Sequence, residues 1–352
     1  MTENFYYLAA YTAAAAVGLT ERDACDIARA ARFTERYTAE GSEDPDQGCP
    51  GKKAGSPGMM SALHYLPGDA EQIIGLIAPE LRSSVPFTNE AALVSAPGGD
   101  LFRRAAQCAR ETWQESGECG MAQACQAAGI VLHALADTYL HQGFSGVDSE
   151  ETNTVLNIQT AVQPPLADIG PILAQCAFQP EEVELLFQME SYIPEGPPAS
   201  FRGCVPLGTL AGIPSQIFTY QSPWRTVPLV TWIGPFRFAG AYLVMKEALL
   251  YILGEKQSVA LPIESADSFL QLALFFSGIS SDGDLPRRWW QQFSWCKQRA
   301  PDYEEPLWNR DRVYIDDFEQ LLLGFRDRLL EESPTLCIAA QLARAGGTGG
   351  TS

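Results

Sequence analysis

The chain has 352 residues, and its 43 acidic side chains outnumber its 24 basic ones, which gives a net charge of −19 at pH 7. This charge argues against a nucleic-acid backbone or an anionic membrane surface as the main partner. The expected partner is therefore a small-molecule substrate, with no nucleic acid, and the oligomeric state is not predicted.

The absence of a long apolar run indicates that the chain has no membrane span, which needs about 20 such residues. The Ala-rich segment near the N-terminus follows Glu3 and has no basic residue before it, so it predicts a helix of the mature protein rather than a signal peptide. Nine scattered cysteines without C-x-x-C spacing are typical of reduced thiols. The expected location is cytoplasmic.

Helical periodicity predicts a first helix over residues 5–17 and a second over residues 21–37, separated by Gly18. Thr20 and Asp23 fit the N-terminal cap of the second helix. Further helices are expected over residues 71–78, 100–114, 171–178, 181–189, 236–253, 263–279 and 314–332, and residues 121 to about 142 are expected to form a central buried helix. Strand alternation is scarce, so the predicted fold class is all-α, a multi-helix bundle of roughly ten helices.

Segments rich in Pro and Gly interrupt these helices. Residues 39–58 predict a loop, and residues 194–228 predict a long wrapping loop. Arg287, Arg288, Trp289 and Trp290 form, together with Trp295 and Trp308, an aromatic and basic patch that is interpreted as a packed edge or, alternatively, a ligand cradle. Residues 1–344 are expected to form a single domain, followed by a flexible tail over residues 345–352.

The most informative stretch is residues 121–146, because two of the three histidines in the chain lie there. His133, Asp137 and His141 are spaced by four residues, so on a helix all three side chains point roughly one way. Their neighbours are apolar, and burying such a trio is unfavourable unless the groups are paired or bind a metal. The alternative is a core helix whose polar groups are satisfied by backbone.

Helix geometry separates the roles of the two histidines. His133 and Asp137 lie about 6 Å apart along the axis, which one ion can bridge. His133 and His141 lie about 12 Å apart and differ by roughly 80° in direction, so one ion is not expected to take both. A closed site also needs a ligand from another element, and the remaining histidine, His64, precedes a Pro67-Gly68 turn. Packing beside that turn is the alternative role for His64.

Four segments carry a resemblance to known proteins: NFYYLAAYTAAAAVGL (residues 4–19), ALHYLPG (62–68), LHALADTYLHQGFSG (132–146) and, more weakly, VPLGTLAGIPSQ (205–216). They resemble an uncharacterised microbial all-helical family with an H-A-L-x-D-x-x-x-H-Q-G-F-S-G motif. Its layout is similar to that of zinc-dependent phospholipase C and P1 nuclease. The resemblance implies that fold, with the long Pro/Gly-rich loop.

The resemblance implies metal ligation by His64, His133 and Asp137, with His141 as a ligand or near-ligand. In a hydrolase, His141 and Glu35 are the expected catalytic residues, and either one would act as the general base. Glu35 falls where such relatives place an acidic residue, and it is expected either to act as a base or to complete the metal's ligands. This chain departs from the family pattern at Tyr6, Thr209 and Ser215, where the relatives have two histidines and an aspartate. A single ion is therefore expected rather than a multi-zinc cluster.

Four functions fit these residues. The first is a zinc hydrolase acting on a small ester, amide or phosphoester. The second uses the same ligands to hold Fe(II) for oxygen chemistry. The third is a metal-free isomerase, cyclase or lyase in which His–Asp pairs act as acid and base in an aromatic pocket, and the fourth is a non-catalytic descendant. No phosphate-binding loop, G-x-S-x-G or G-x-G-x-x-G motif is present.

Overall fold

The computed structural model describes residues 2–38, 62–69, 95–117, 120–141, 217–221, 226–230, 233–259, 271–272, 275–276, 285–296 and 312–333. This part of the chain is mostly helical, as the sequence predicted. Its helices are α1 (Thr2–Ala16), α2 (Glu21–Thr38), α5 (Asp100–Glu115), α6 (Met121–Leu140), α11 (Ile233–Ile252), α13 (Leu285–Gln292) and α14 (Arg312–Glu332). No helix within the described ranges is both long and apolar enough to cross a membrane.

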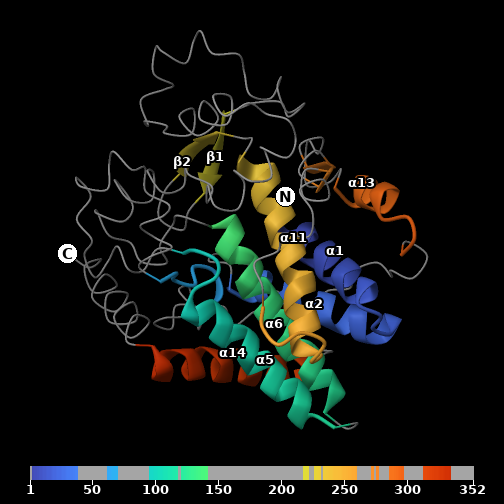
Figure 1. The fold of residues 1–352 in the computed structure, drawn as a ribbon, viewed down its shortest axis with the longest axis vertical. Coiled ribbons are helices and arrows are strands. Elements are labelled where there is room, and N and C mark those ends of the chain that lie inside the picture. Colours follow the sequence, from blue (N-terminus) through green and yellow to red (C-terminus); the bar gives the residue numbers. More distant parts are fainter. Residues whose placement is uncertain are drawn as a thin grey trace, which may run out of the picture.

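Helix α6 lies at the centre, where it packs against α1, α2, α5, α11 and α14 (Figure 1). Every residue from Ala124 to Leu140 is buried. This burial follows from the sequence, because α6 is apolar on all faces and a helix of that kind belongs in a core. His133 and Asp137, two of the buried polar residues within it, are therefore held away from bulk water.

The connection between α1 and α2 forms as its residues predicted. Gly18 has a φ of +88°, a left-handed conformation that favours glycine and ends α1. The Oγ1 atom of Thr20 accepts a hydrogen bond from the backbone N–H of Asp23 at 3.2 Å and so caps α2. The turn returns α2 along α1, and both helices then reach the central helix.

Two elements differ from the sequence prediction. Within the expected loop over residues 194–228, β1 (Ile217–Gln221) pairs antiparallel with β2 (Thr226–Val230), so the loop prediction is wrong for these residues. Their aromatic and β-branched residues favour extended backbone, and Pro228 is tolerated because a two-stranded ribbon has only edge strands. Helix α13 was not predicted as a helix.

The aromatic patch around α13 is a packed edge. Trp289 is fully buried, and its Nε1–H donates to Thr12 Oγ1 at 2.9 Å. Trp295 is 57% exposed and lies at the surface. Trp289 therefore agrees with the packing interpretation of the patch, whereas Trp295 does not.

Several predictions lie outside the described residues: the helices over 71–78, 171–178 and 181–189, the loop over 39–58, the tail, and the positions Thr209, Ser215 and Trp308. The helix expected over 263–279 is described only at residues 271–272 and 275–276, which are helical.

Candidate metal centre

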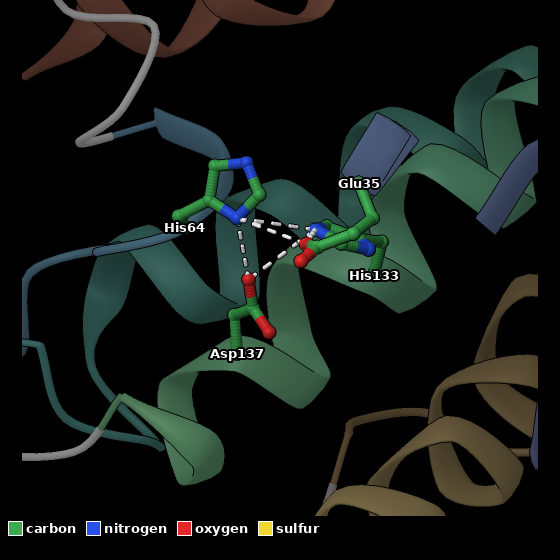
Figure 2. Close-up of side chains that lie close together, drawn as sticks. All are labelled: Glu35, His64, His133 and Asp137. Atoms are coloured by element: carbon green, nitrogen blue, oxygen red, sulfur yellow. Dashed lines mark hydrogen bonds and ion pairs between the residues drawn. The ribbon is translucent and has the colours of Figure 1, made fainter. Parts of the chain in front are cut away.

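Four side chains from three segments meet beside α6: Glu35 of α2, His64 of the short segment 62–69, and His133 and Asp137 of α6. One nitrogen or carboxylate oxygen from each lies within 4.8 Å of the corresponding atom of every other. Figure 2 shows the four side chains pointing toward one another. The proximity of His64, His133 and Asp137 is as the sequence predicted, while their role as ligands stays a prediction.

The closest contacts converge on one oxygen of Asp137. Asp137 Oδ2 lies 2.8 Å from His64 Nδ1 and 3.2 Å from His133 Nε2. The two histidine nitrogens lie 3.3 Å from each other. Glu35 Oε2 is slightly farther away, at 3.7 Å from each of these nitrogens. Three donor atoms thus form a tight triangle, with the Glu35 carboxylate beside it.

A close approach between α2 and α6 places Glu35 over His133. Gly129 of α6 lies so near α2 that an added Cβ would be 2.4 Å from the carbonyl oxygen of Ile27 and 2.6 Å from the Cβ of Ala30. One helical turn beyond this contact on both helices, Glu35 and His133 meet. Only glycine allows this spacing, so Gly129 helps to set the position of the acidic side chain.

The segment that carries His64 is tied to the start of α5. Pro67 forms an isolated antiparallel β-bridge with Ser95, which lies shortly before α5. The Asp69 carboxylate accepts hydrogen bonds from the backbone N–H of Asp100, at 3.0 and 3.1 Å to its two oxygens. A carboxylate is favourable at this helix N-terminus, where backbone N–H groups are otherwise unpaired. These contacts fix the segment a few residues after His64.

His141 lies at the edge of the cluster rather than inside it. Its Nε2 is 3.5 Å from Asp137 Oδ2, and its ring packs against Tyr65 with 4.9 Å between ring centroids. It follows the last residue of α6, and 15% of its side chain is exposed. His141 therefore has a carboxylate partner, one of the roles expected from its spacing, and stands nearer to solvent than His133.

The charges of the cluster shift two pKa values in opposite directions. Burial raises the pKa of Asp137, but the charges and hydrogen bonds of His133 and His141 outweigh it and hold that pKa well below its ordinary value of 3.8. Burial lowers the pKa of His64, but the hydrogen bond and charge of Asp137 and the charge of Glu35 raise it above the ordinary 6.5. A proton on His64 thus supplies positive charge to a site rich in acceptors.

Tyr6 of α1 belongs to the site, although it was not among the predicted site residues. Its hydroxyl donates a hydrogen bond to Asp137 Oδ1. The centroid of its ring lies 4.1 Å from the centroid of the His133 ring. Its position in an apolar helix with Phe5 and Tyr7 gave no sign of this contact. The only signal was the resemblance, which led us to expect a histidine at this position.

The donor set fits a single small divalent ion. Zinc bonds to histidine nitrogen and carboxylate oxygen are about 2.0–2.2 Å long, so two ligands of a tetrahedral site lie about 3.3–3.5 Å apart. The 3.2 and 3.3 Å separations are close to that range, whereas the 2.8 Å separation of His64 Nδ1 from Asp137 Oδ2 is that of a hydrogen bond, and the 3.7 Å contacts of Glu35 are slightly longer. His64, His133 and Asp137 could therefore hold the ion, with Glu35 adjacent.

Comparisons with known proteins give one relation. Residues 1–313 match the model of a family of unknown function, DUF6765. No curated protein matches the chain, and no solved structure matches it. The match spans most of the 352 residues and includes all four clustered side chains. The chain therefore belongs to the DUF6765 family of unknown function.

Proposed function

We propose that the protein is a metal-dependent hydrolase that holds one ion, best matched by zinc, through His64, His133 and Asp137. The observation that carries this proposal is the triangle of donor atoms from two separate segments, with edges of 2.8–3.3 Å, inside a buried region. Two imidazoles and a carboxylate are a common ligand set of catalytic zinc. Without an ion, the buried side chains of His64, His133 and Asp137 offer more hydrogen-bond acceptors than donors, which is unfavourable away from water.

Glu35 is assigned as the general base rather than a fourth ligand. Its oxygen lies farther from the histidine nitrogens than the ligands lie from one another. Its side chain is 21% exposed, whereas those of His133 and Asp137 are 0% exposed, so Glu35 lies nearer to solvent than these two, with its Oε2 atom itself buried. A carboxylate at this position can accept the proton of an attacking water molecule.

A zinc ion with an open position acidifies water toward neutral pH and polarises a carbonyl or phosphoryl oxygen. His141 supplies the second proton-transfer group. It is partly exposed and contacts Asp137 Oδ2, so it can donate a proton to a leaving group while the carboxylate stabilises its charged form.

The proposed substrate is a small ester, amide or phosphoester. Residues 132–146 resemble an all-helical family whose layout is similar to that of zinc-dependent phospholipase C and P1 nuclease, and this resemblance supports the substrate class. The same ligands also suit Fe(II) and oxygen chemistry, because two histidines and a carboxylate are the usual donors of such sites.

The test is elemental analysis of protein purified without a histidine tag, combined with assays on chromogenic esters, amides and phosphoesters. We expect about one zinc per chain and hydrolysis that stops after chelation and returns with zinc. Asp137→Ala should lose both. Iron with oxygen consumption would favour the alternative, and activity that survives complete metal removal would overturn the proposal in favour of a metal-free acid–base site.

Glu35→Gln separates a base from a ligand. The amide keeps the shape of the side chain but cannot accept the proton. We expect unchanged zinc content and a rate lower by about 10²–10⁴, the usual scale for a lost general base. Loss of zinc in this variant would instead make Glu35 a fourth ligand and the site a closed one.

A further inference from the structure

Tyr6 divides the two oxygens of Asp137 between two kinds of partner. Oδ2 faces the nitrogens of His64, His133 and His141, at distances of 2.8–3.5 Å. Oδ1 accepts the hydrogen bond from the Tyr6 hydroxyl. Both Tyr6 and Asp137 are fully buried, so water does not replace this contact easily. Only one oxygen of the carboxylate is therefore available to an ion.

We propose that Tyr6 sets the metal preference of the site by restricting Asp137 to ligation through one oxygen. This inference rests on the proposed metal centre and adds a determinant of which ion it takes. A carboxylate that binds through both oxygens suits larger ions with six or more ligands, such as Mn²⁺ or Ca²⁺. A carboxylate that binds through one oxygen suits a four-coordinate ion such as Zn²⁺.

The ring of Tyr6 also positions His133. His133 Nδ1 is buried and has no hydrogen-bond partner among the described residues. Metal-binding histidines are usually oriented by a hydrogen bond from their second nitrogen. In its place the Tyr6 ring lies against the imidazole, with 4.1 Å between centroids and 37° between ring planes. One side chain thus constrains two of the three ligands, and it does so from a helix that carries none of them.

The experiment compares Tyr6→Phe with the wild type in competition titrations with Zn²⁺ and Mn²⁺. The variant removes only the hydroxyl and keeps the ring over His133. We expect Zn²⁺ affinity to fall about 10- to 100-fold, the usual effect of losing a group that orients a ligand, and Mn²⁺ affinity to fall less. The zinc-to-manganese affinity ratio should therefore decrease. A general loss of packing would lower both affinities together.

Tyr11→Phe is the matched control. Tyr11 lies on the same helix and is fully buried, but its ring packs against Tyr7 and Trp290. It should leave the affinity ratio unchanged. An unchanged ratio in Tyr6→Phe, with zinc still bound by the wild type, would overturn this inference alone. Failure of the wild type to bind either ion would overturn the proposed function together with it.

The absorption spectrum of bound Co²⁺ tests the same inference on the wild type and so does not depend on how the Tyr6→Phe variant folds. Co²⁺ in place of zinc absorbs visible light strongly when it has four ligands and weakly when it has six. We expect the strong spectrum for the wild type and a weaker one for Tyr6→Phe. A weak, six-coordinate spectrum in the wild type would contradict restriction of Asp137 to one oxygen.

Discussion

The two halves of α6 do different things, although both are buried from Ala124 to Leu140. The first half, Met121–Gly129, carries small side chains and Gly129, which let α2 approach closely. The second half carries His133 and Asp137, and every close contact of their polar atoms is with another polar group of the cluster. Burial alone does not separate a packing helix from a helix that bears chemistry. The grouping of polar atoms from distant segments does.

The two halves are also coupled, because α2 runs along both. Ile27 and Ala30 contact the first half at Gly129, and Glu35 reaches the second half one turn later. Packing in one half therefore sets geometry in the other. Variants that alter one half at a time test how far this coupling extends.

The largest expected effect is that of His133→Ala. Removal of one of three ligands should abolish zinc content and hydrolysis together, because the remaining two ligands leave a weak site. Gln126→Ala is the matched control, since Gln126 is a buried polar residue in the first half of the same helix. It should keep the ion. If elemental analysis shows equal metal loss in both variants, the second half of α6 has no special role in metal binding.

His141→Ala should keep most of the zinc and slow turnover by about 10²–10⁴, the usual scale for a lost general acid. The reason is that His141 contacts the Asp137 carboxylate and lies outside the group of four. Metal stoichiometry and rate, measured on one preparation, decide this. If His141→Ala loses as much metal as His133→Ala, the two histidines are equivalent ligands.

Metal removal should destabilise the fold of the wild type. An ion present at 100 times its dissociation constant stabilises a folded protein by about 2.7 kcal/mol. A chelator should therefore lower the melting temperature of the wild type and leave that of His133→Ala unchanged. Equal shifts in both proteins would show that the chelator acts elsewhere.

Gly129→Ala tests the packing half. The added Cβ would meet backbone of α2, which does not move cheaply, so we expect a loss of about 1–3 kcal/mol in the free energy of unfolding. Gly324→Ala is the control, because nothing lies within 4 Å of a Cβ built at this position of α14. It should stabilise the protein by about 0.5–1 kcal/mol through helix propensity. Urea denaturation of both variants measures the difference.

Gly129→Ala also tests the coupling between the halves. If the new side chain displaces α2, Glu35 moves away from His133 and hydrolysis falls more than zinc content does. A destabilised variant with wild-type turnover would show that the packing half and the polar half are independent.

The smallest expected effect is the pH dependence of the metal-free protein. The lowered pKa of Asp137 adds stability that is present above 3.8 and is lost as pH falls through its value in the folded protein. The raised pKa of His64 adds stability that is present below 6.5 and is lost as pH rises through its folded value. Metal-free wild type should therefore be most stable between these limits. Asp137→Asn should show a flatter profile in urea denaturation.

Local patterns predicted most of this architecture. Helical periodicity placed α1, α2, α5, α6, α11 and α14 close to their observed limits. The four-residue spacing of His133, Asp137 and His141 identified the half of α6 that carries the candidate site. His64 followed from the need for a ligand on a second element. The helix limits and the proximity of these side chains could be predicted because each depends on neighbours in sequence or on a simple geometric requirement, while their role as metal ligands stays a prediction.

The remaining features depend on contacts that sequence spacing does not encode. Tyr6 meets Asp137 across 131 residues, and an aromatic residue in an apolar helix gives no sign of its partner. The ribbon of β1 and β2 was missed because Pro228 lies within a strand. Helix α13 has only eight residues, too few for a periodic pattern.

The distances along the chain between the groups at Asp137 have a kinetic consequence. Tyr6 lies 131 residues before it and His64 lies 73 residues before it. Contacts between such distant segments require closure of long loops and form late in folding. During synthesis, the segments that carry Tyr6, Glu35 and His64 leave the ribosome before α6 is complete. These side chains therefore cannot contact Asp137 and His133 until α6 has formed. Uptake of an ion at full affinity would then mark the moment at which α6 docks against both earlier segments.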